Sequence, residues 1–484
     1  MNKQTLIQRL HGVLPKAAVL HELEDLKPFE CDGLSAYRQV PMAVVLVDNE
    51  EQVRDTLLLC KELGVPVVAR GAGTGLSGGA LPLAESVLLS LARLNKIITL
   101  DPLARVARVQ PGVRNLAISE AAAPHGLYYA PDPSSQIACS IGGNVAENAG
   151  GVHCLKYGLT VHNILKIRAW TIDGELLEIG SEALDSPGFD LLALFTGSEG
   201  MLGVITEVTL KLLPKPELAQ VVMAAFDTVE AAGRAVGDIM ASGIIPAGLE
   251  MMDKLAIQAA EGYAHVGYPL DAAAILLCES DGTPEEVAED IAKIQQILSR
   301  CGATSLRTSQ SEAERLQLWA GRKAAFPAVG RLSPDYYCMD GTIPRRELPR
   351  VLNRIDELSQ QYGLRVANVF HAGDGNLHPL ILYDANQPGE FHRAEELGGK
   401  ILELCVEVGG TITGEHGVGI EKINQMCVQF ASAELQRFRE IKYCFDSAGL
   451  LNPGKLIPTL HRCAEHGRMH VHHGKLPFPD IPRL

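Results

Sequence analysis

The chain has 484 residues, of which 46% are hydrophobic and 21% are charged, and its formal net charge is -15. That length exceeds what one hydrophobic core usually serves, so the composition predicts a soluble globular protein of two or more domains. An acidic surface excludes nucleic acid and anionic lipid as main partners. No apolar run is long enough to span a bilayer directly, and no CxxC pair marks an iron–sulfur or zinc-ribbon site among the eleven cysteines. Scattered thiols in a long chain indicate a reducing cytoplasm.

A glycine-rich loop follows a β-rich run early in the chain. In VPVVARGAGTGLSGGALP, residues 65–82, glycine fills five of the nine positions from Gly71 to Gly79. Glycine lets the backbone approach a ligand closely, so successive amide groups can form a nest for an anion. The spacing differs from GxxxxGK[ST] and no lysine follows, so a Walker A loop fits poorly. A glycine-rich turn without a ligand is the alternative interpretation.

Two more loops of similar composition follow before a proline-marked boundary near residue 215. PDPSSQIACSIGGNVAENAGGVHCLKYG (131–158) and FTGSEGMLGVITEV (195–208) are dense in Gly, Asn and Ser. Flexible glycine is costly unless a close approach requires it. Three such loops in one domain therefore indicate a bound ligand.

A strand–helix rhythm follows the boundary. VVMAAF precedes an expected helix at 228–242, and AAAILLCES precedes TPEEVAEDIAKIQQILSR, which begins with Thr283 as N-cap, Pro284 at N1 and Glu286 at N3. The apolar face of that second helix comprises Val287, Ile291, Ile294 and Leu298. Units of this kind predict an antiparallel sheet covered on one face by helices.

The segment VFHAGDGNLHP, residues 369–379, predicts a β-hairpin. Asp374-Gly375 is a favoured two-residue type I′ turn, and a hairpin centred there pairs His371 directly with His378. Directly opposed residues share a face with their Cβ atoms roughly 5 Å apart. Two imidazoles held in this way form half of a metal site, and hydrogen-bonded structural histidines are the alternative.

The three glycine-rich loops together resemble the FAD-binding domain of the vanillyl-alcohol-oxidase (PCMH-type) class of flavoproteins. The resemblance implies an α+β fold, with a two-subdomain FAD-binding domain and a cap domain whose mainly antiparallel sheet is covered by helices. The expected parts are an N-terminal helical segment (1–36), the FAD-binding domain (37–215), a substrate domain with a metal site (216–451) and a tail returning to the FAD domain (452–484). FAD is expected to be non-covalent, because the first loop has no histidine for attachment.

The resemblance also assigns residues around FAD. The first loop would hold the pyrophosphate, the second loops would line the ribityl chain, flavin and adenine, and the third would close over the adenine side. Asn452, in LNPGKLIP (451–458), would approach the flavin. The implied set is Arg70, Gly71, Ala72, Gly73, Thr74, Gly75, Leu76, Ser77, Pro131, Asp132, Ser134, Gly143, Asn144, Asn148, Gly151, Glu199, Gly203, Ile205 and Asn452.

FHAGDGNLHP and TITGEHGVGIEK (411–422) resemble the D-2-hydroxyacid dehydrogenase branch of this class. The resemblance implies a divalent metal held by His371, His378 and Glu415, with His416 as the catalytic base. Two imidazoles and a carboxylate suit Zn²⁺, the first choice, and leave positions open for a substrate hydroxyl and carboxylate. Fe²⁺ and Mn²⁺ remain alternatives.

A substrate carboxylate requires a local cation, and arginine serves better than lysine because it binds in a bidentate manner. In LQLWAGRKAAFPAVGR, Arg322 stands where the family keeps its substrate arginine, and Lys323 is the competing choice. The tail is rich in histidine and either binds metal or is a surface segment, which is the preferred interpretation. These histidines are His461, His466, His470, His472 and His473.

CDGLSAYRQVP (31–41) and the tail resemble the FAD-binding subunits of bacterial glycolate oxidases. The resemblance implies oxidation of glycolate, and also D-lactate, to the 2-oxoacid, with electrons passed to a second FAD-binding-like subunit and an iron–sulfur subunit. The expected location is cytoplasmic, at the inner membrane face through those partners. The alternatives are a D-lactate or D-2-hydroxyglutarate dehydrogenase, a non-redox transferase on the same fold, and a metal-binding or scaffold subunit without activity.

Three positions indicate whether the substrate hydroxyacid carries one carboxylate or two. Relatives that take dicarboxylates keep a lysine in the segment matching DYYCMDGTIP, where this chain has Cys338 and Met339. They also keep an amide where this chain has Leu380. A second carboxylate would be left unpaired in a closed site, so a short acid with one carboxylate is favoured.

Overall fold

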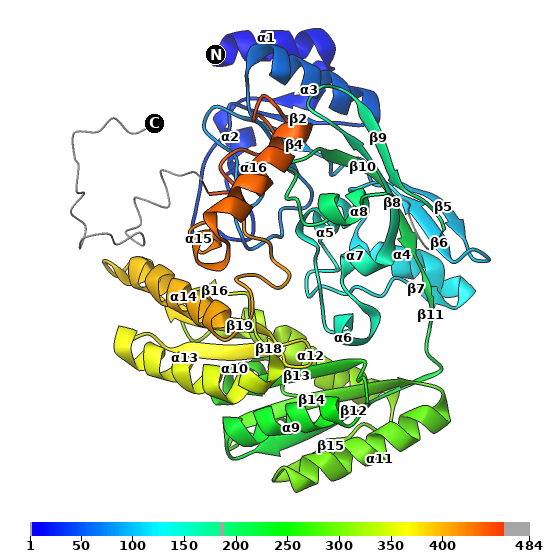
Figure 1. The fold of residues 1–484 in the computed structure, drawn as a ribbon, viewed down its shortest axis with the longest axis vertical. Coiled ribbons are helices and arrows are strands. Elements are labelled where there is room, and N and C mark those ends of the chain that lie inside the picture. The colour runs from blue at the N-terminus through cyan, green and yellow to red at the C-terminus, as the bar shows by residue number, and fades with distance from the viewer. Residues whose placement is uncertain (1, 184–187, 459–484) are drawn as a thin grey trace.

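The computed structural model describes residues 2–183 and 188–458. The histidine-rich tail considered above, from His461 to His473, lies outside these residues. Figure 1 shows two parts stacked along the long axis, with the N-terminal part above a cap built on one large sheet.

The first sheet of the N-terminal part carries the glycine-rich loop. Its inner strands are parallel, and helices α1 (Lys3–Val13) and α3 (Glu50–Leu63) bury their apolar side chains against it. The loop leaves the carboxyl end of β3, the usual place for ligand-binding loops in parallel sheets. In sheet order the strands are β1 (Val19–Leu20), β2 (Ala43–Leu46), β4 (Val87–Ser90) and β3 (Val67–Arg70).

The second sheet of this part is antiparallel and has five strands. In sheet order they are β5 (Ile97–Asp101), β6 (Val106–Val109), β10 (Val204–Lys211), β8 (Ile164–Trp170) and β9 (Leu176–Gly180). The helices whose apolar residues join its core are α4 (Asn115–Ala122), α5 (Ile141–Glu147) and α8 (Leu191–Phe195). Shorter elements are α2 (Leu23–Leu26), β7 (Leu127–Tyr128), α6 (Cys154–Tyr157), α7 (Thr160–Asn163) and β11 (Leu213–Pro214).

The cap is built on an antiparallel sheet, as the sequence predicts. In sheet order its strands are β15 (Ser305–Thr308), β12 (Leu218–Phe226), β14 (Ala274–Gly282), β13 (Gly248–Asp253), β18 (Val366–His371), β19 (Asn376–Tyr383) and β16 (Asp335–Cys338), with β17 (Gly341–Thr342) also paired to β19. Alternate residues of β12 point into two different cores: Val222 and Ala224 into one, Val221 and Met223 into the other. Both faces of the sheet are therefore buried.

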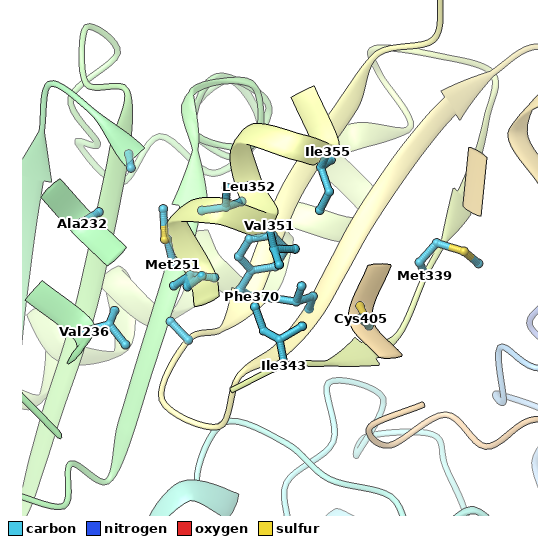
Figure 2. Packing of buried hydrophobic residues seen from close by; sticks show 14 of the residues in the cluster. Ala232, Val236, Met251, Met339, Ile343, Val351, Leu352, Ile355, Phe370 and Cys405 are labelled. Carbon is cyan, nitrogen blue, oxygen red and sulfur yellow. The ribbon is translucent and has the colours of Figure 1, made fainter. Parts of the chain in front are cut away.

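Helices cover both faces, so the expectation of a single covered face is wrong. The first face carries α9 (Val229–Ala241), α11 (Pro284–Arg300), α13 (Leu348–Tyr362) and α14 (Glu390–Glu407), and the second carries α10 (Lys254–Ala264) and α12 (Glu312–Val329). The strands are apolar on both sides, a pattern that requires a cover on each. Figure 2 shows the first core, where Val351, Leu352 and Ile355 of α13 lie near Phe370 of β18.

The predicted start of α11 is confirmed. The Thr283 side chain accepts a hydrogen bond from the backbone N–H of Glu286, whose carboxylate accepts in turn from the backbone of Thr283. Val287, Ile291 and Ile294 are buried against the sheet. Local capping chemistry thus fixes where this helix begins.

The chain then returns to the N-terminal part. Helices α15 (Met426–Gln429) and α16 (Ser432–Phe445) lead upward in Figure 1, and the rings of Phe445 and Phe195 meet edge to face at 5.2 Å. Beyond α16, Leu451 forms a parallel bridge with Val67 at the start of β3. No helix in the two described ranges is both long and apolar enough to cross a membrane.

Candidate functional site

The predicted hairpin is present as β18 and β19, but its register differs from the prediction. His371 pairs with Asn376, and His378 pairs with Val369, so the direct pairing of the two histidines is wrong. The connecting loop has four residues, 372–375, instead of two. The shift amounts to two residues, and an even shift keeps each side chain on its face. The histidines are therefore diagonal neighbours, with ring centroids 5.1 Å apart.

Tertiary contacts explain the longer loop. The backbone N–H groups of Asp374 and Gly375 both donate to the His371 carbonyl, at 3.2 and 3.0 Å. The N–H of Gly373 instead donates to Leu249 of β13, at 2.9 Å. The loop is thus anchored to a strand that lies more than a hundred residues earlier in the chain.

The imidazoles of His371 and His378 converge on Glu415. The Nε2 atoms of His371 and His378 lie 3.2 and 2.9 Å from its Oε1 atom. One ligand atom from each of the three residues falls within a mutual distance of 4.8 Å. The predicted metal ligands are therefore brought together.

A buried carboxylate orients His371 from behind. Glu250 of β13 accepts from His371 Nδ1 at 2.7 Å, and its other oxygen lies 2.6 Å from Nη2 of Arg322. A histidine that donates one ring N–H to a carboxylate presents its second nitrogen as a metal ligand. On the second ring, Nδ1 of His378 lies 3.4 Å from the Met339 carbonyl, which stands where Glu250 stands for His371.

Asp340, between β16 and β17, holds the loop that carries Glu415 and His416. Its Oδ2 atom accepts from the backbone N–H groups of Gly414 and His416, each at 3.0 Å, and from Nζ of Lys422 at 3.1 Å. Burial opposes ionisation of Asp340, yet the Lys422 ammonium and the neighbouring imidazoles hold its pKa well below the usual range. The loop geometry therefore depends on a permanent buried negative charge.

His416 stacks on His378, with ring centroids 4.9 Å apart and an interplanar angle of 13°. Its Nδ1 atom is buried and has no hydrogen-bond partner among the described residues. Burial lowers the pKa of His416 to about 4, so the imidazole is neutral at neutral pH. A neutral ring with a free nitrogen can accept a proton.

One cavity of about 460 Å³ joins the glycine-rich loop to this cluster. At the loop end, a Cβ added to Gly71 would meet Oγ of Ser140 at 2.1 Å, and Gly73 has a left-handed φ of 72°. Only glycine therefore permits this backbone path beside the cavity. At the other end the lining includes Lys323, His371, His378, Glu415 and His416.

Predicted cofactor residues divide into two groups. Those lining the cavity are Arg70, Gly71, Ala72, Gly73, Thr74, Gly75, Leu76, Ser134, Gly143, Asn144, Glu199, Gly203 and Ile205. Those outside its lining are Ser77, Pro131, Asp132, Asn148, Gly151 and Asn452. Asn452 instead supports the lining from behind, because its amide donates to the carbonyls of Gly79 and Glu199 at 2.9 and 2.7 Å.

The two candidate cations for a substrate carboxylate are neighbours on helix α12, but their side chains lie in different surroundings. Arg322 is buried against Glu250 and lies outside the lining, whereas the neighbouring Lys323 lines the cavity. The residue that the resemblance assigns to the substrate thus lies behind His371.

Glu199 connects the two parts at the cavity. It is buried, and its carboxylate accepts from the backbone N–H groups of Val418 and Gly419 at 2.7 and 2.8 Å. The loop that carries Glu415 is therefore fastened directly to the glycine-rich part.

Sequence reasoning missed Glu250, Asp340 and Lys422. Each is a charged residue in or next to an apolar run, in GLEMMD, CMDGT and GVGIEK. A charge at a position that strand alternation or an apolar run buries must have a partner, and that signal could have identified them.

Comparison with known proteins gives two family matches. A model described as "FAD binding domain" matches residues 41–180, and one described as "FAD linked oxidases, C-terminal domain" matches residues 215–456. The chain is 69% identical to "Glycolate oxidase subunit GlcD" of Escherichia coli (strain K12), over 100% of this chain and 97% of that protein. It is 38% identical to the protein of the same name from Bacillus subtilis (strain 168), over 89% and 92%.

Two further matches have lower identity. A "D-lactate dehydrogenase" of Anaerostipes hadrus is 31% identical over 95% of this chain and 99% of that protein. Among solved structures, p-cresol methylhydroxylase with substrate bound has a TM-score of 0.78 at 17% identity, covering 95% of this chain and 97% of that one. The predicted PCMH-type fold is thus confirmed, and the chain belongs to the family of FAD-linked oxidases.

Proposed function

We propose that this chain oxidises a short 2-hydroxyacid, glycolate and also D-lactate, to the 2-oxoacid. The observation that carries the proposal is the single cavity shared by the glycine-rich loop and the cluster of His371, His378 and Glu415. A hydroxyacid bound at the cluster would face the place where FAD is expected. The names of the relatives at 69% and 31% identity, a glycolate oxidase subunit and a D-lactate dehydrogenase, support this substrate class.

The donor set fits a divalent metal, with Zn²⁺ as first choice. Two Nε2 atoms and one carboxylate oxygen converge, and Glu250 fixes the ring of His371 from behind. A bound divalent ion supplies a Lewis acid that lowers the pKa of a coordinated hydroxyl. His416, whose Nδ1 atom has no hydrogen-bond partner in the described part of the chain, would then accept the hydroxyl proton.

The first part of the chain fits FAD. The main chain of Gly71–Leu76 and the side chain of Arg70 would hold the pyrophosphate, and Ser134, Gly143 and Asn144 would lie along the rest of the cofactor. Bound FAD supplies an acceptor for the hydride that leaves the substrate α-carbon. The glycine-rich loop contains no histidine, which supports non-covalent binding.

A cation on α12 would hold the substrate carboxylate. Lys323 lines the cavity, whereas Arg322 forms an ion pair with Glu250. We therefore assign the contact with the substrate carboxylate to Lys323, and we propose that Arg322 supports Glu250. Both residues thereby act on the same substrate, one directly and one through the metal ligand His371.

The electron acceptor is proposed to be a protein partner. The relative named as a subunit supports assembly of this chain into a complex. We propose a second FAD-binding-like subunit and an iron–sulfur subunit as partners, with the complex in the cytoplasm at the inner membrane face. Reoxidation of the isolated reduced chain by O₂ at the rate of substrate turnover would count against a partner-dependent route.

Anaerobic bleaching of the flavin absorbance tests the proposal. Glycolate and D-lactate are expected to bleach the FAD-loaded protein at least about 100-fold faster than D-2-hydroxyglutarate, because an unpaired second carboxylate costs several kcal/mol. L-lactate is expected to be the poorest chiral monoacid. No bleaching by any hydroxyacid would exclude the redox function, and equal rates for D-2-hydroxyglutarate would exclude the preference for short acids.

A further inference from the structure

A second set of metal-binding side chains lies beside the first. Cys338, His378 and His416 each offer one ligand atom, and these atoms fall within 4.8 Å of one another. His378 belongs to both sets, whereas Cys338 and His416 have no role as ligands in the first. The second set therefore offers sulfur and nitrogen where the first offers nitrogen and oxygen.

Sheet geometry brings the cysteine to this place. Cys338 ends β16 and pairs with Leu380 of β19, so it lies diagonal to His378, two residues away on the same face. His416 completes the set from the loop held by Asp340, stacked on the His378 ring. All three positions are thus fixed by strand register or by a buried ion pair.

Two of the three residues of this set, Cys338 and His416, are lightly engaged. Nδ1 of His416 is buried and has no hydrogen-bond partner within the described ranges. The residue Cys338 is 5% exposed and forms no disulfide, and among the described residues its thiol makes one weak hydrogen bond, to the Met339 carbonyl at 3.4 Å. An ion that enters would release the thiol proton and would engage His378, which the first set also uses.

We infer that Cys338, His378 and His416 form a second metal position, selective for soft, thiophilic ions. Sulfur and imidazole ligands favour soft ions, whereas the carboxylate-containing set suits harder ones. Binding forms a sulfur–metal bond and releases the thiol proton to solvent, with no change of oxidation state. An ion held there occupies His416, so this position is inhibitory if the proposed function, on which that consequence rests, is correct.

Cd²⁺ is a suitable probe, because it binds thiolates and gives a thiolate-to-metal charge-transfer absorption. We would titrate the full-length, FAD-loaded protein with Cd²⁺ after chelator treatment and record the difference spectrum together with the bound Cd²⁺ by equilibrium dialysis. The wild-type protein is expected to show a thiolate–cadmium band that Cys338→Ser loses. Cys444→Ser removes an exposed cysteine and serves as the matched control that retains the band.

Two further variants separate this position from the first. Glu415→Gln is expected to keep the band, because Glu415 belongs only to the first set. His416→Gln is expected to weaken the Cd²⁺ affinity measured from the band by at least about tenfold. Retention of the FAD spectrum verifies that each variant is folded. A band of unchanged size and affinity in Cys338→Ser, or in His416→Gln, would overturn the inference.

Inhibition provides the second readout. Half-inhibition of substrate-driven flavin bleaching by Cd²⁺ is expected to require at least about tenfold more Cd²⁺ in Cys338→Ser than in the wild-type protein, each measured against its own uninhibited rate. If no hydroxyacid bleaches the flavin, the proposed function fails, yet the charge-transfer titration still decides whether the second position exists. An equal Cd²⁺ requirement in both proteins would exclude the inhibitory role.

Discussion

Asp340 and Lys422 form an ion pair of 3.1 Å in which both side chains are fully buried. The same carboxylate accepts from the backbone on both sides of Glu415, so the pair sets the position of a proposed metal ligand and of the neighbouring base. Removal of one partner of a buried ion pair typically costs about 3–5 kcal/mol, and without Asp340 the Lys422 ammonium would keep only Glu421 as an ion-pair partner among the described residues, at 3.4 Å.

Asp340→Asn is therefore expected to lower the free energy of unfolding by about 3–5 kcal/mol and to weaken metal binding, as measured by urea unfolding and metal content. The double variant Asp340→Asn/Lys422→Met is expected to recover part of the stability, because the Lys422 ammonium is removed together with its partner Asp340. It is not expected to recover metal binding, because the loop has lost its acceptor. Full additivity of the two single changes would contradict the coupling.

His378→Ala is expected to lose the bound metal and to reduce activity by at least about 100-fold, because Lewis-acid stabilisation is worth several kcal/mol. The FAD content should stay unchanged, since the glycine-rich loop lies in the other part of the chain. Metal analysis and the flavin spectrum test both statements. His392→Ala, at an exposed histidine of α14, is the matched control that retains metal and activity.

Lys323→Met is expected to raise the KM for glycolate by about 10- to 100-fold, because a charge-assisted hydrogen bond contributes about 1.5–3 kcal/mol. Lys323→Arg should restore most of the affinity. Arg322→Met should instead reduce metal affinity by about 10- to 100-fold, since Glu250 loses its partner behind His371. A raised KM with normal metal content in Arg322→Met would reverse the two assignments.

His153 links the two parts of the molecule through charge. Its Nδ1 lies 2.8 Å from Asp132 and its Nε2 lies 3.1 Å from Glu279 of the cap. Burial opposes the charged form, but the two carboxylates outweigh it and raise the pKa of His153 to about 10. Because the folded pKa lies above the unfolded value of about 6.5, the stabilisation is complete below that pH and is lost as pH rises through 10.

His153→Gln is accordingly expected to lower the free energy of unfolding by about 1.5–3 kcal/mol at pH 6, where the wild-type imidazole is charged in both states. The difference between the two proteins should shrink between about pH 6.5 and pH 10. Chemical unfolding of both proteins across that range gives the measurement. A difference that grows with pH would contradict the charged link.

The sequence predicts those parts of the fold that depend on local chemistry. The cap of α11 at Thr283 is determined by neighbours within a few residues. The loop from Gly71 to Gly79 is marked by its glycine content alone. The glycine-rich loops and the histidine motif were also sufficient to indicate the family. These features need no knowledge of distant contacts.

The hairpin and the supporting charges show where local reasoning ends. The loop between β18 and β19 contains a favoured turn pair, but the hydrogen bond from Gly373 to Leu249 selects the longer connection. Glu250 and Arg322 meet behind His371 from positions far apart in the chain. Only the folded sheet places them together, so no motif in a single stretch contains the information.

The return of the chain after α16 has a consequence for biosynthesis. The Asn452 side chain and Lys455 bond to the Gly79 carbonyl at the cavity wall, and Leu451 bridges to Val67. A ribosome makes the glycine-rich loop hundreds of residues before it makes these supports, and nascent domains generally fold from the N-terminus. The pocket therefore matures only after residues 451–455 have emerged, which places cofactor capture late in biosynthesis.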